Sequence, residues 1–453
     1  MLIEFVSSFA APQSGAASYS SLMAFPRVVV LVLLLLVGAL VLFYGKSLCT
    51  SNWKVAVSST PAVAWVLAKF EKEPVHTLDK AAVEKLAKDH RLNMDSVAAR
   101  RLSRDMFLAT HSEFDFSVPP HKDKEMGLKV TETYVKNSRN LEIFVKSWVP
   151  LNGRPKGILF ICHGYGDTVT FFNEGLARAL AMAGYAVYGM DYPGFGLSEG
   201  LHGYIPNFDI LVDDVIEQYR LIKERPENKG LSCFLFGESM GGAVALKAHL
   251  KEPSMWDGAV LVAPMCKIAD AMYPPWYLVR IMITLAYVIP KVKLVPHTDI
   301  AELGFRNLEK RARANYNPVA YIGNPRLGTA LQLLQTTDFV ESKLEEVSLP
   351  LLVLHGAADQ VTDPSISKLL YEKAKSEDKS LKLYDDAWHC LLQGEPDDMV
   401  KKVMMDIVSW LDDHVASKGD FDQQDETDME NRISEAAPNL IEFGKFDAVK
   451  ELL

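Results

Sequence analysis

The chain has 453 residues, of which 49% are hydrophobic and 23% charged, a composition typical of a globular protein with a sizeable core. Its formal net charge is −10 and no basic stripe stands out along the sequence, which argues against a nucleic-acid partner. Five cysteines, an odd number without pairing spacings, indicate free thiols and a reducing compartment.

The first 54 residues form a leader with one long apolar segment. Residues 22–44 are apolar apart from Pro26 and Arg27, long enough for one tilted transmembrane helix. A secretory signal would be shorter and would need a small-residue cleavage site, which Gly45-Lys46-Ser47-Leu48 supplies poorly. We expect a single-pass membrane anchor with the rest of the chain in the cytosol. A cleaved secretory signal and an organelle-targeting (plastid) leader are the alternatives.

Residues 55–126 are expected to be a helical lead-in to the main domain. Apolar residues recur at helical spacing in 79–92, after a plausible cap, and again in 94–108. At the other end, residues 416–453 carry many carboxylates and few cations, which predicts a disordered acidic tail.

Residues 127–415 show a hairpin followed by repeated strand and helix units. Helical stretches at 170–183, 207–224, 240–250 and 364–375 separate most of the buried-type strands. Strands buried on both faces and alternating with helices indicate a mostly parallel sheet. The pattern therefore predicts an α/β-hydrolase fold with an eight-stranded sheet. The expected strands are 128–135, 141–149, 157–162, 186–190, 231–236, 258–263, 349–354 and 380–384.

A long insertion, about 267–346, interrupts this rhythm without a clear strand. Structureless segments of that length are rare in compact domains, so we expect helices. The insertion contains an apolar stretch with Trp276 and Tyr277, followed by a cationic stretch. It is predicted to be a lid over a ligand tunnel, and contact with a membrane is a further possibility. A packed helical subdomain with a solvated charged face is the alternative.

The spacing G-x-S-x-G occurs twice, around Ser198 and around Ser239. A nucleophilic serine of this motif lies on a sharp turn from a strand into a helix. Ser239 follows a buried-type strand and begins a run of good helix formers, whereas Ser198 has loop sequences on both sides. Only Ser239 has the required context, so it is the predicted nucleophile.

On this fold an acid and then a histidine follow the serine in the chain. Asp359 comes after the strand at 349–354 and has no structural duty, whereas Asp363 precedes Pro364 and is expected to cap a helix. Only two histidines follow Asp359. His389 lies in a turn after the last strand, and His414 lies near a helix end.

Asp359 and His389 are therefore the predicted acid and base. Asp385 and Asp386, close to His389 in the sequence, are fallback partners for it. An ester hydrolase also needs two hydrogen-bond donors for the oxyanion. The backbone amide of Met240 is one candidate and that of Tyr165, in a glycine-containing loop after the third strand, is the other.

Four further residues, given below, are candidates for substrate binding. One of them, His163, is also expected to orient the loop that carries Tyr165. We find no phosphate-binding loop, no dinucleotide fingerprint and no metal-ligand spacing, so no cofactor or metal is expected. The candidates for substrate binding are His163, Gly164, Trp276 and Tyr277.

With these residues placed, the chain resembles the monoacylglycerol lipase and lysophospholipase group of α/β-hydrolases, above all plant members called caffeoylshikimate esterases. The likeness covers roughly residues 127–415. It implies Ser239 as nucleophile, Asp359 as acid and His389 as base, with the amides of Tyr165 and Met240 as oxyanion donors. The segments that carry it are Asn137-Ser138-Arg139, Ser147-Trp148, His163-Gly164-Tyr165-Gly166-Asp167, Asp191-Tyr192-Pro193-Gly194-Phe195-Gly196, residues 198–205, Gly237-Glu238-Ser239-Met240-Gly241-Gly242 and Trp388-His389.

The sequence thus predicts a serine ester hydrolase that works through an acyl-enzyme. The apolar insertion suits a fatty acyl chain, which favours a monoacylglycerol or lysophospholipid substrate. Hydroxycinnamoyl esters of the caffeoylshikimate type are the second candidate. An acyltransferase on the same scaffold and a non-catalytic small-molecule receptor are the alternatives from other classes.

Overall fold

The computed structural model describes residues 93–110, 120–267, 276–295, 300–314 and 317–415, all within one compact unit. The predicted transmembrane segment at 22–44, the helical stretch at 79–92 and the acidic tail from 416 lie outside these residues. In the part of the chain that is described, no helix combines the length and the apolar character that a membrane crossing needs.

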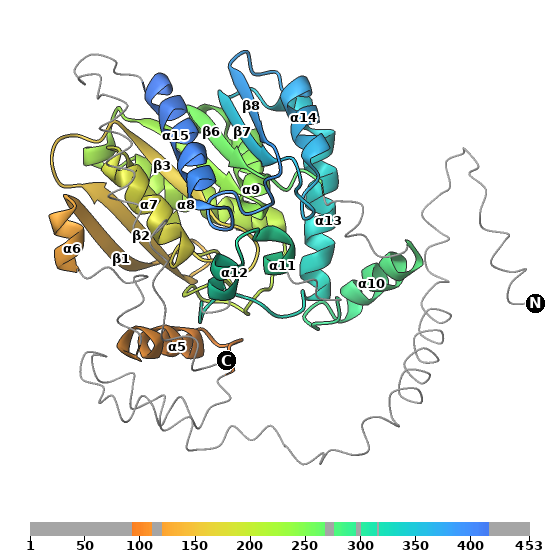
Figure 1. Ribbon diagram of the computed structural model, residues 1–453. Helices are drawn as coiled ribbons and strands as arrows, with labels where there is room; N and C mark the ends of the chain where they lie inside the picture. The colour runs from red at the N-terminus through yellow and green to blue at the C-terminus, as the bar shows by residue number, and fades with distance from the viewer. Residues whose placement is uncertain (1–92, 111–119, 268–275, 296–299, 315–316, 416–453) are drawn as a thin grey trace, which may run out of the picture. The chain divides into compact units, whose positions relative to one another are not determined.

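One eight-stranded sheet forms the centre of the molecule, in the order β1-β2-β4-β3-β5-β6-β7-β8 (Figure 1). Strand β2 runs antiparallel to its neighbours β1 and β4, and the other neighbouring strands are parallel. The predicted hairpin and mostly parallel sheet are therefore confirmed. The strands are β1 Leu128–Lys136, β2 Glu142–Pro150, β3 Gly157–Cys162, β4 Ala186–Met190, β5 Ser232–Glu238, β6 Gly258–Val262, β7 Leu351–Gly356 and β8 Lys379–Tyr384.

Helices cover both faces of the sheet, which is why the central strands are apolar along their whole length. In β3, Ile158 and Phe160 pack toward α8 and α9, whereas Leu159 and Ile161 pack toward α7 and α15. Figure 1 shows α7 and α15 on the near face of the sheet. The covering helices are α7 Phe172–Met182, α8 Phe208–Lys223, α9 Met240–Lys251, α14 Pro364–Lys373 and α15 Asp397–His414.

The described residues of the segment between β6 and β7 contain helices and no strand, as the sequence predicts. Its first helix, α10, is almost entirely apolar, yet only Ala286 among its residues is buried. This helix packs against α13, which also contacts α8 and α9. The helices of the insertion are α10 Trp276–Val288, α11 Ile300–Gly304, α12 Leu308–Ala314 and α13 Leu327–Ser342.

In the described part of the chain, two helices precede the sheet, α5 Val97–Thr110 and α6 Pro120–Glu125. Helix α5 confirms the helix predicted at 94–108. Unlike most surface helices it buries an arginine, Arg100, which is inaccessible to solvent. A buried guanidinium is costly unless its hydrogen bonds are satisfied, so its partners within the fold matter.

Candidate active site

Ser239 lies on the tight turn between β5 and α9, the position that the sequence predicts. Its backbone angles are φ 54° and ψ −121°, a strained combination for a residue with a side chain. The flanking glycines make the turn possible. A Cβ at Gly237 would lie 2.5 Å from the carbonyl oxygen of Gly241, and one at Gly241 would lie 1.8 Å from that of Cys162.

Ser198, the serine of the other motif, is buried in a loop. Its Oγ donates to the carbonyl of Asp191 at 2.6 Å and accepts from the amide of Phe144 at 2.8 Å. Both hydrogen bonds satisfy backbone groups of neighbouring segments, which is a structural task. The contrast that the sequence predicts between the two serines is present in the fold.

Asp359 and His389 meet at the edge of the sheet where β7 and β8 end. His389 Nδ1 lies 2.7 Å from Asp359 Oδ2, and His389 lines the same cavity as Ser239. The other carboxylate oxygen of Asp359 accepts from the amides of Val361 at 2.7 Å and Thr362 at 3.1 Å. The structure therefore brings the three predicted residues to one site, in the chain order serine, acid, histidine.

The protonation behaviour of this pair follows from burial and charge. Burial works to lower the pKa of His389, but the negative charge and hydrogen bond of Asp359 outweigh it, so the net shift is upward from the usual 6.5. Burial works to raise the pKa of Asp359, and the two histidines beside it, His389 and His355, bring it well below its usual range. Asp359 is therefore ionised at neutral pH and can orient and stabilise a protonated His389.

The sequence analysis missed two further partners of Asp359. His355, at the end of β7, is fully buried and its Nε2 lies 3.0 Å from Asp359 Oδ2. Thr362 donates its hydroxyl to the same oxygen at 2.8 Å. Ser367 holds the other ring nitrogen of His355 at 2.7 Å. The sequence does contain a signal for His355, because it lies in a buried strand four positions before the predicted acid.

The residues set aside at the sequence level have the structural roles expected of them. Asp363 caps α14, where its side chain accepts from the amide of Ser365 and Pro364 occupies the first turn. His414 ends α15, where its ring contacts the carbonyl of Trp410 and the carboxylate of Asp378.

The loop after β3 passes directly over Ser239. A Cβ at Gly164 would lie 3.6 Å from Ser239 Cβ, and Tyr165 and Met240 line the same cavity as the serine. Met240 is the first residue of α9, and an amide at that position has no acceptor within its own helix. Both predicted oxyanion residues are thus placed beside the predicted nucleophile.

His163, a candidate for substrate binding, does not line this cavity. It is buried, its ring stacks on Tyr192 at 3.9 Å between centroids, and its Nε2 accepts from the amide of Tyr192 at 3.3 Å. Burial lowers its pKa to about 4, so the ring is neutral at physiological pH. This geometry fits the alternative expectation, that His163 orients the loop that carries Tyr165.

A cavity of about 780 Å³ leads from the insertion to Ser239 and His389. Apolar side chains line most of it, from α13 and from one side of α10. Four α10 residues line it, namely Leu278, Val279, Met282 and Ile283.

Trp276 and Tyr277, the other candidates for substrate binding, are not among the lining residues. Their side chains are 77% and 51% exposed. Tyr277 lies off the face that Val279, Met282 and Ile283 share at spacings of three and four. Trp276 is the first residue of α10 and is exposed at that end of the helix. Of the four proposed binding residues, only Gly164 lines the cavity.

The end of the cavity near the triad is polar, which the sequence analysis also missed. Glu238, directly before the serine, accepts from Gln393 Nε2 at 2.7 Å, and Asp167 accepts from Asn173 Nδ2 at 3.0 Å. Burial raises the pKa of both carboxyls, and that of Asp167 reaches about 7. These groups can accept or donate hydrogen bonds to hydroxyls of a bound ligand. Among the described residues, no group of three or more His, Cys, Asp or Glu side chains is arranged to hold a metal ion.

Comparison with known proteins agrees with this geometry. A family model described as serine aminopeptidase S33 matches residues 153–397, more than half of the chain. Caffeoylshikimate esterase of Arabidopsis thaliana is 33% identical over 294 residues, which are 65% of this chain and 88% of that protein. Human monoglyceride lipase is 31% identical over 283 residues, 62% of this chain and 91% of that protein.

Among solved structures, a soluble variant of monoglyceride lipase from Saccharomyces cerevisiae, in complex with a substrate analog, superposes with a TM-score of 0.58. The two sequences are 21% identical, and the match covers 64% of this chain and 96% of that one, which supports the fold. The family match, the two curated relatives and the serine-bearing turn lead to one conclusion. The chain belongs to the serine aminopeptidase S33 family of α/β-hydrolases and is a carboxylic ester hydrolase.

Proposed function

We propose that this hydrolase cleaves esters of a long fatty acid with a small polar alcohol, as in monoacylglycerols and lysophospholipids. The cavity carries the proposal, because its long part is apolar and its catalytic end is polar. Burying a methylene group contributes about 0.8 kcal/mol. Each methylene of an acyl chain along α10 and α13 would therefore add to the binding free energy. The human relative bears the name monoglyceride lipase, in keeping with this choice.

In the proposed mechanism His389 donates Nδ1–H to Asp359, which leaves Nε2 to take the proton of Ser239. The serine oxygen bonds to the ester carbonyl carbon, and the amides of Tyr165 and Met240 stabilise the resulting oxyanion. The protonated His389 then gives its proton to the departing alcohol, and an acyl-enzyme remains. Water, deprotonated by His389, adds to the acyl carbon and releases the fatty acid and free Ser239.

The polar end of the cavity supports an alcohol with free hydroxyl groups. Asp167, Glu238 and Gln393 line it beside the serine; Glu238 is buried and Asp167 is half-buried. We propose that they bind hydroxyls of the leaving alcohol. Each carboxyl already accepts one hydrogen bond from a neighbouring amide, and its second oxygen can bind a hydroxyl that an alcohol without hydroxyls could not supply.

We also propose that α10 acts as a lid. It contributes a wall of the cavity, packs on α13, and exposes further apolar side chains, Trp276 and Tyr287 among them. A helix of this kind can move to admit substrate because few of its side chains are buried.

A hydroxycinnamoyl ester is the second candidate, and one observation favours it. Four aromatic rings line the cavity, those of Tyr165, Phe172, Phe305 and Tyr321, and such rings can pack against an aromatic acyl group. The Arabidopsis relative bears the name caffeoylshikimate esterase.

A substrate panel separates the two candidates. The purified full-length protein would be given monoacylglycerols of increasing chain length, lysophospholipids and caffeoyl esters, with Ser239→Ala as background. We expect kcat/KM to rise with acyl length until the cavity is full. Hydrolysis restricted to the aromatic esters would contradict the lipid proposal.

A pair of adjacent tryptophan variants tests whether the acyl chain occupies the cavity. Met282→Trp adds bulk to the cavity wall, whereas Ile281→Trp adds it at the next position, which is exposed and lines no part of the cavity. We expect Met282→Trp to lose hydrolysis of long-chain esters and to keep that of short-chain esters. Ile281→Trp should retain both, and equal losses in the two variants would count against the proposed acyl site.

For the leader we propose a membrane anchor at residues 22–44, with the catalytic domain on the cytosolic side. Its support is the apolar sequence of this segment, which carries no charge from Val28 to Tyr44. Alkaline carbonate extraction should leave the full chain in the membrane fraction. Protease added to sealed vesicles shows on which side of the membrane the catalytic domain lies. Release of the intact full chain by carbonate would contradict the anchor.

A further inference from the structure

Helix α5 lies outside the segment that the family model matches, yet it is joined to the catalytic domain by buried polar contacts. Its fully buried Arg100 donates hydrogen bonds to main-chain carbonyls. Nε donates to Gly196 at 2.6 Å, and Nη2 donates to Ser198 at 2.6 Å and to Gly200 at 3.3 Å. The planar guanidinium thus holds three carbonyls of one loop in a fixed arrangement.

The turn before α5 holds the far end of the same loop. Asp95 accepts from Arg326 Nη2 at 2.5 Å, and Arg326 Nε in turn donates to the carbonyl of His202 at 3.0 Å. Arg326 is buried, so Asp95 supplies the charge that its guanidinium needs. Residues 196–202, here called the clamped loop, are therefore held near one end by Arg100 and at the other end by Arg326, whose guanidinium pairs with Asp95.

The clamped loop is in turn bonded to the loop 163–168, which carries Tyr165. Asp191 connects them: its Oδ2 accepts from the amide of Leu197 at 2.8 Å, and its Oδ1 accepts from Thr168 Oγ1 at 2.6 Å. The Tyr165 ring also packs edge-on against Phe195, just before the clamped loop, at 5.8 Å between centroids. Arg100 is thus connected to the loop of the predicted oxyanion residue through three hydrogen-bonded contacts, Arg100 to Gly196, Leu197 to Asp191 and Thr168 to Asp191.

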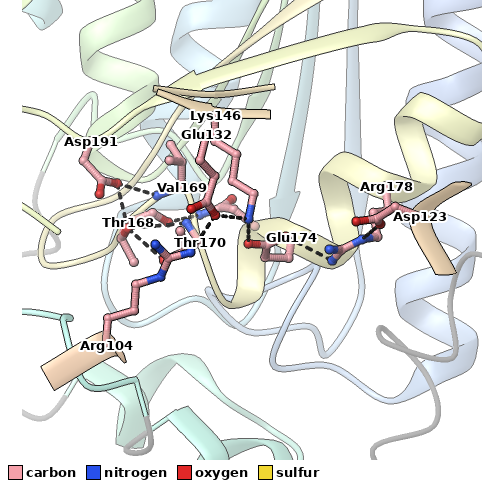
Figure 2. Close-up of polar contacts among 11 residues, drawn as sticks. Arg104, Asp123, Glu132, Lys146, Thr168, Val169, Thr170, Glu174, Arg178 and Asp191 are labelled. Atoms are coloured by element: carbon pink, nitrogen blue, oxygen red, sulfur yellow. Dashed lines mark hydrogen bonds and ion pairs between the residues drawn. The ribbon is translucent and has the colours of Figure 1, made fainter. Parts of the chain in front are cut away.

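A second set of charges fixes α5 to the sheet, as Figure 2 shows. Arg104, one turn beyond Arg100, pairs with Glu132 of β1 at 2.6 Å, and Glu132 also pairs with Lys146 of β2 at 2.8 Å. Burial would raise the pKa of Glu132, but Lys146 and Arg104 outweigh it and lower the pKa to about 2. The chain of ion pairs continues through Lys146, Glu174, Arg178 and Asp123.

We propose that residues 95–104 are a positioning element for catalysis, in which Arg100 holds the clamped loop and, through it, the loop of the oxyanion donor Tyr165. Arg100 is a positioning residue, since it contacts neither the cavity nor the triad. The proposal rests on the proposed oxyanion role of Tyr165. It goes further by giving a catalytic purpose to a helix that the family model does not include.

The test compares Arg100→Met with Arg139→Met in the full-length protein. Arg139 also pairs with a buried group, Asp214 of α8, so its loss is a matched destabilising control. Turnover is divided by the number of serines titrated with a fluorophosphonate, which removes unfolded molecules from the comparison. For Arg100→Met we expect kcat per titrated serine to fall at least about tenfold with KM little changed, because small displacements of catalytic donors are costly.

Hydrogen exchange of the amides in 163–168 gives a readout that needs no substrate. Exchange should accelerate in Arg100→Met and stay unchanged in Arg139→Met. If exchange and kcat per titrated serine both match the wild type while only the melting temperature falls, Arg100 is structural and the proposal is wrong. Failure of the wild type to hydrolyse any ester would count against the proposed function, and the exchange result would still decide on the clamp.

Two milder variants keep the proposal testable if Arg100→Met does not fold. Arg100→Lys retains the charge but not the forked geometry, and Asp95→Asn removes the charge opposite Arg326 at a partly exposed position. We expect the same directions with smaller effects, about threefold in kcat per titrated serine. Wild-type turnover and exchange in both variants would overturn the proposal.

Discussion

The stretches 196–200 and 237–241 have the same G-x-S-x-G spacing and opposite environments. Ser239 is held at φ 54° between a strand and a helix and lines the cavity. Ser198 is buried in a loop, where its hydroxyl joins two backbone groups. The G-x-S-x-G spacing alone therefore specifies a tight turn. The elements on either side of the turn decide whether its serine faces the cavity or the protein interior.

The two turns are nevertheless connected. The clamped loop that contains Ser198 is bonded through Asp191 to the loop that lies over Ser239. We propose that one serine carries out the chemistry and that the other helps to fix the loops around it. Variants of these residues and of their partners separate the two roles.

The largest effect is expected for Ser239→Ala. Loss of a catalytic serine costs about 10⁶ in kcat in a well-studied serine protease, so turnover should fall by at least about 10⁴-fold. Stability should be retained, because the side chain makes no cap hydrogen bond on α9. Steady-state hydrolysis and thermal unfolding measure the two quantities. Turnover within about tenfold of the wild type would exclude Ser239 as the nucleophile.

Asp359→Asn should have the next largest effect, a fall of about 10³–10⁴-fold in kcat. An amide cannot fix the tautomer of His389 or stabilise its positive charge. Asp363→Asn is the matched control, because Asp363 caps α14 and faces no catalytic group in the proposed mechanism. Equal losses for the two variants would show that Asp359 acts only through stability.

Ser198→Ala should lower the free energy of unfolding by about 2–3 kcal/mol, since it leaves a buried amide and a buried carbonyl unsatisfied. Urea unfolding measures the loss. Fluorophosphonate labelling of Ser239 should persist in this variant, with turnover per labelled site reduced at most about tenfold through the clamped loop. Complete loss of labelling in a folded Ser198→Ala protein would contradict the division of roles.

The pH dependence of kcat/KM should show the smallest effect. His389 must be neutral to act as a base, and Asp359 raises its pKa above 6.5, so activity should fall as the pH drops through a midpoint above 6.5. In Asp359→Asn the raising charge is gone and the lowering by burial remains. The residual activity should therefore persist to lower pH, and an unmoved midpoint would show that another group controls this limb.

The sheet and the candidate triad could be predicted from the sequence because their signals are local. Buried strands are short apolar runs that can be read directly. Asp363 could be set aside because it precedes Pro364 at the start of a helix. Chain order then left few histidines to choose from. Composition alone misplaced Trp276 and Tyr277, since the face of α10 that lines the cavity depends on how the helix packs against α13.

Other parts of the site could not be predicted, because they depend on which distant segments meet. Glu238 bonds to Gln393, 155 positions along the chain, and Arg100 bonds to carbonyls 96 to 100 positions away. A main-chain carbonyl leaves no residue-specific mark in the sequence, so the partners of Arg100 were invisible there. His355 could be predicted only in part. Its position close to Asp359 is evident from the sequence, whereas the orientation of its ring toward the carboxylate is not.

The position of the fluorophosphonate adduct distinguishes Ser239 from Ser198 as the nucleophile. The labelled protein would be digested and the modified peptide identified by mass spectrometry in the wild type, Ser239→Ala and Ser198→Ala. The account predicts one adduct, on Ser239, that is absent from Ser239→Ala and present in Ser198→Ala. An adduct on Ser198, or labelling that survives Ser239→Ala, would contradict it.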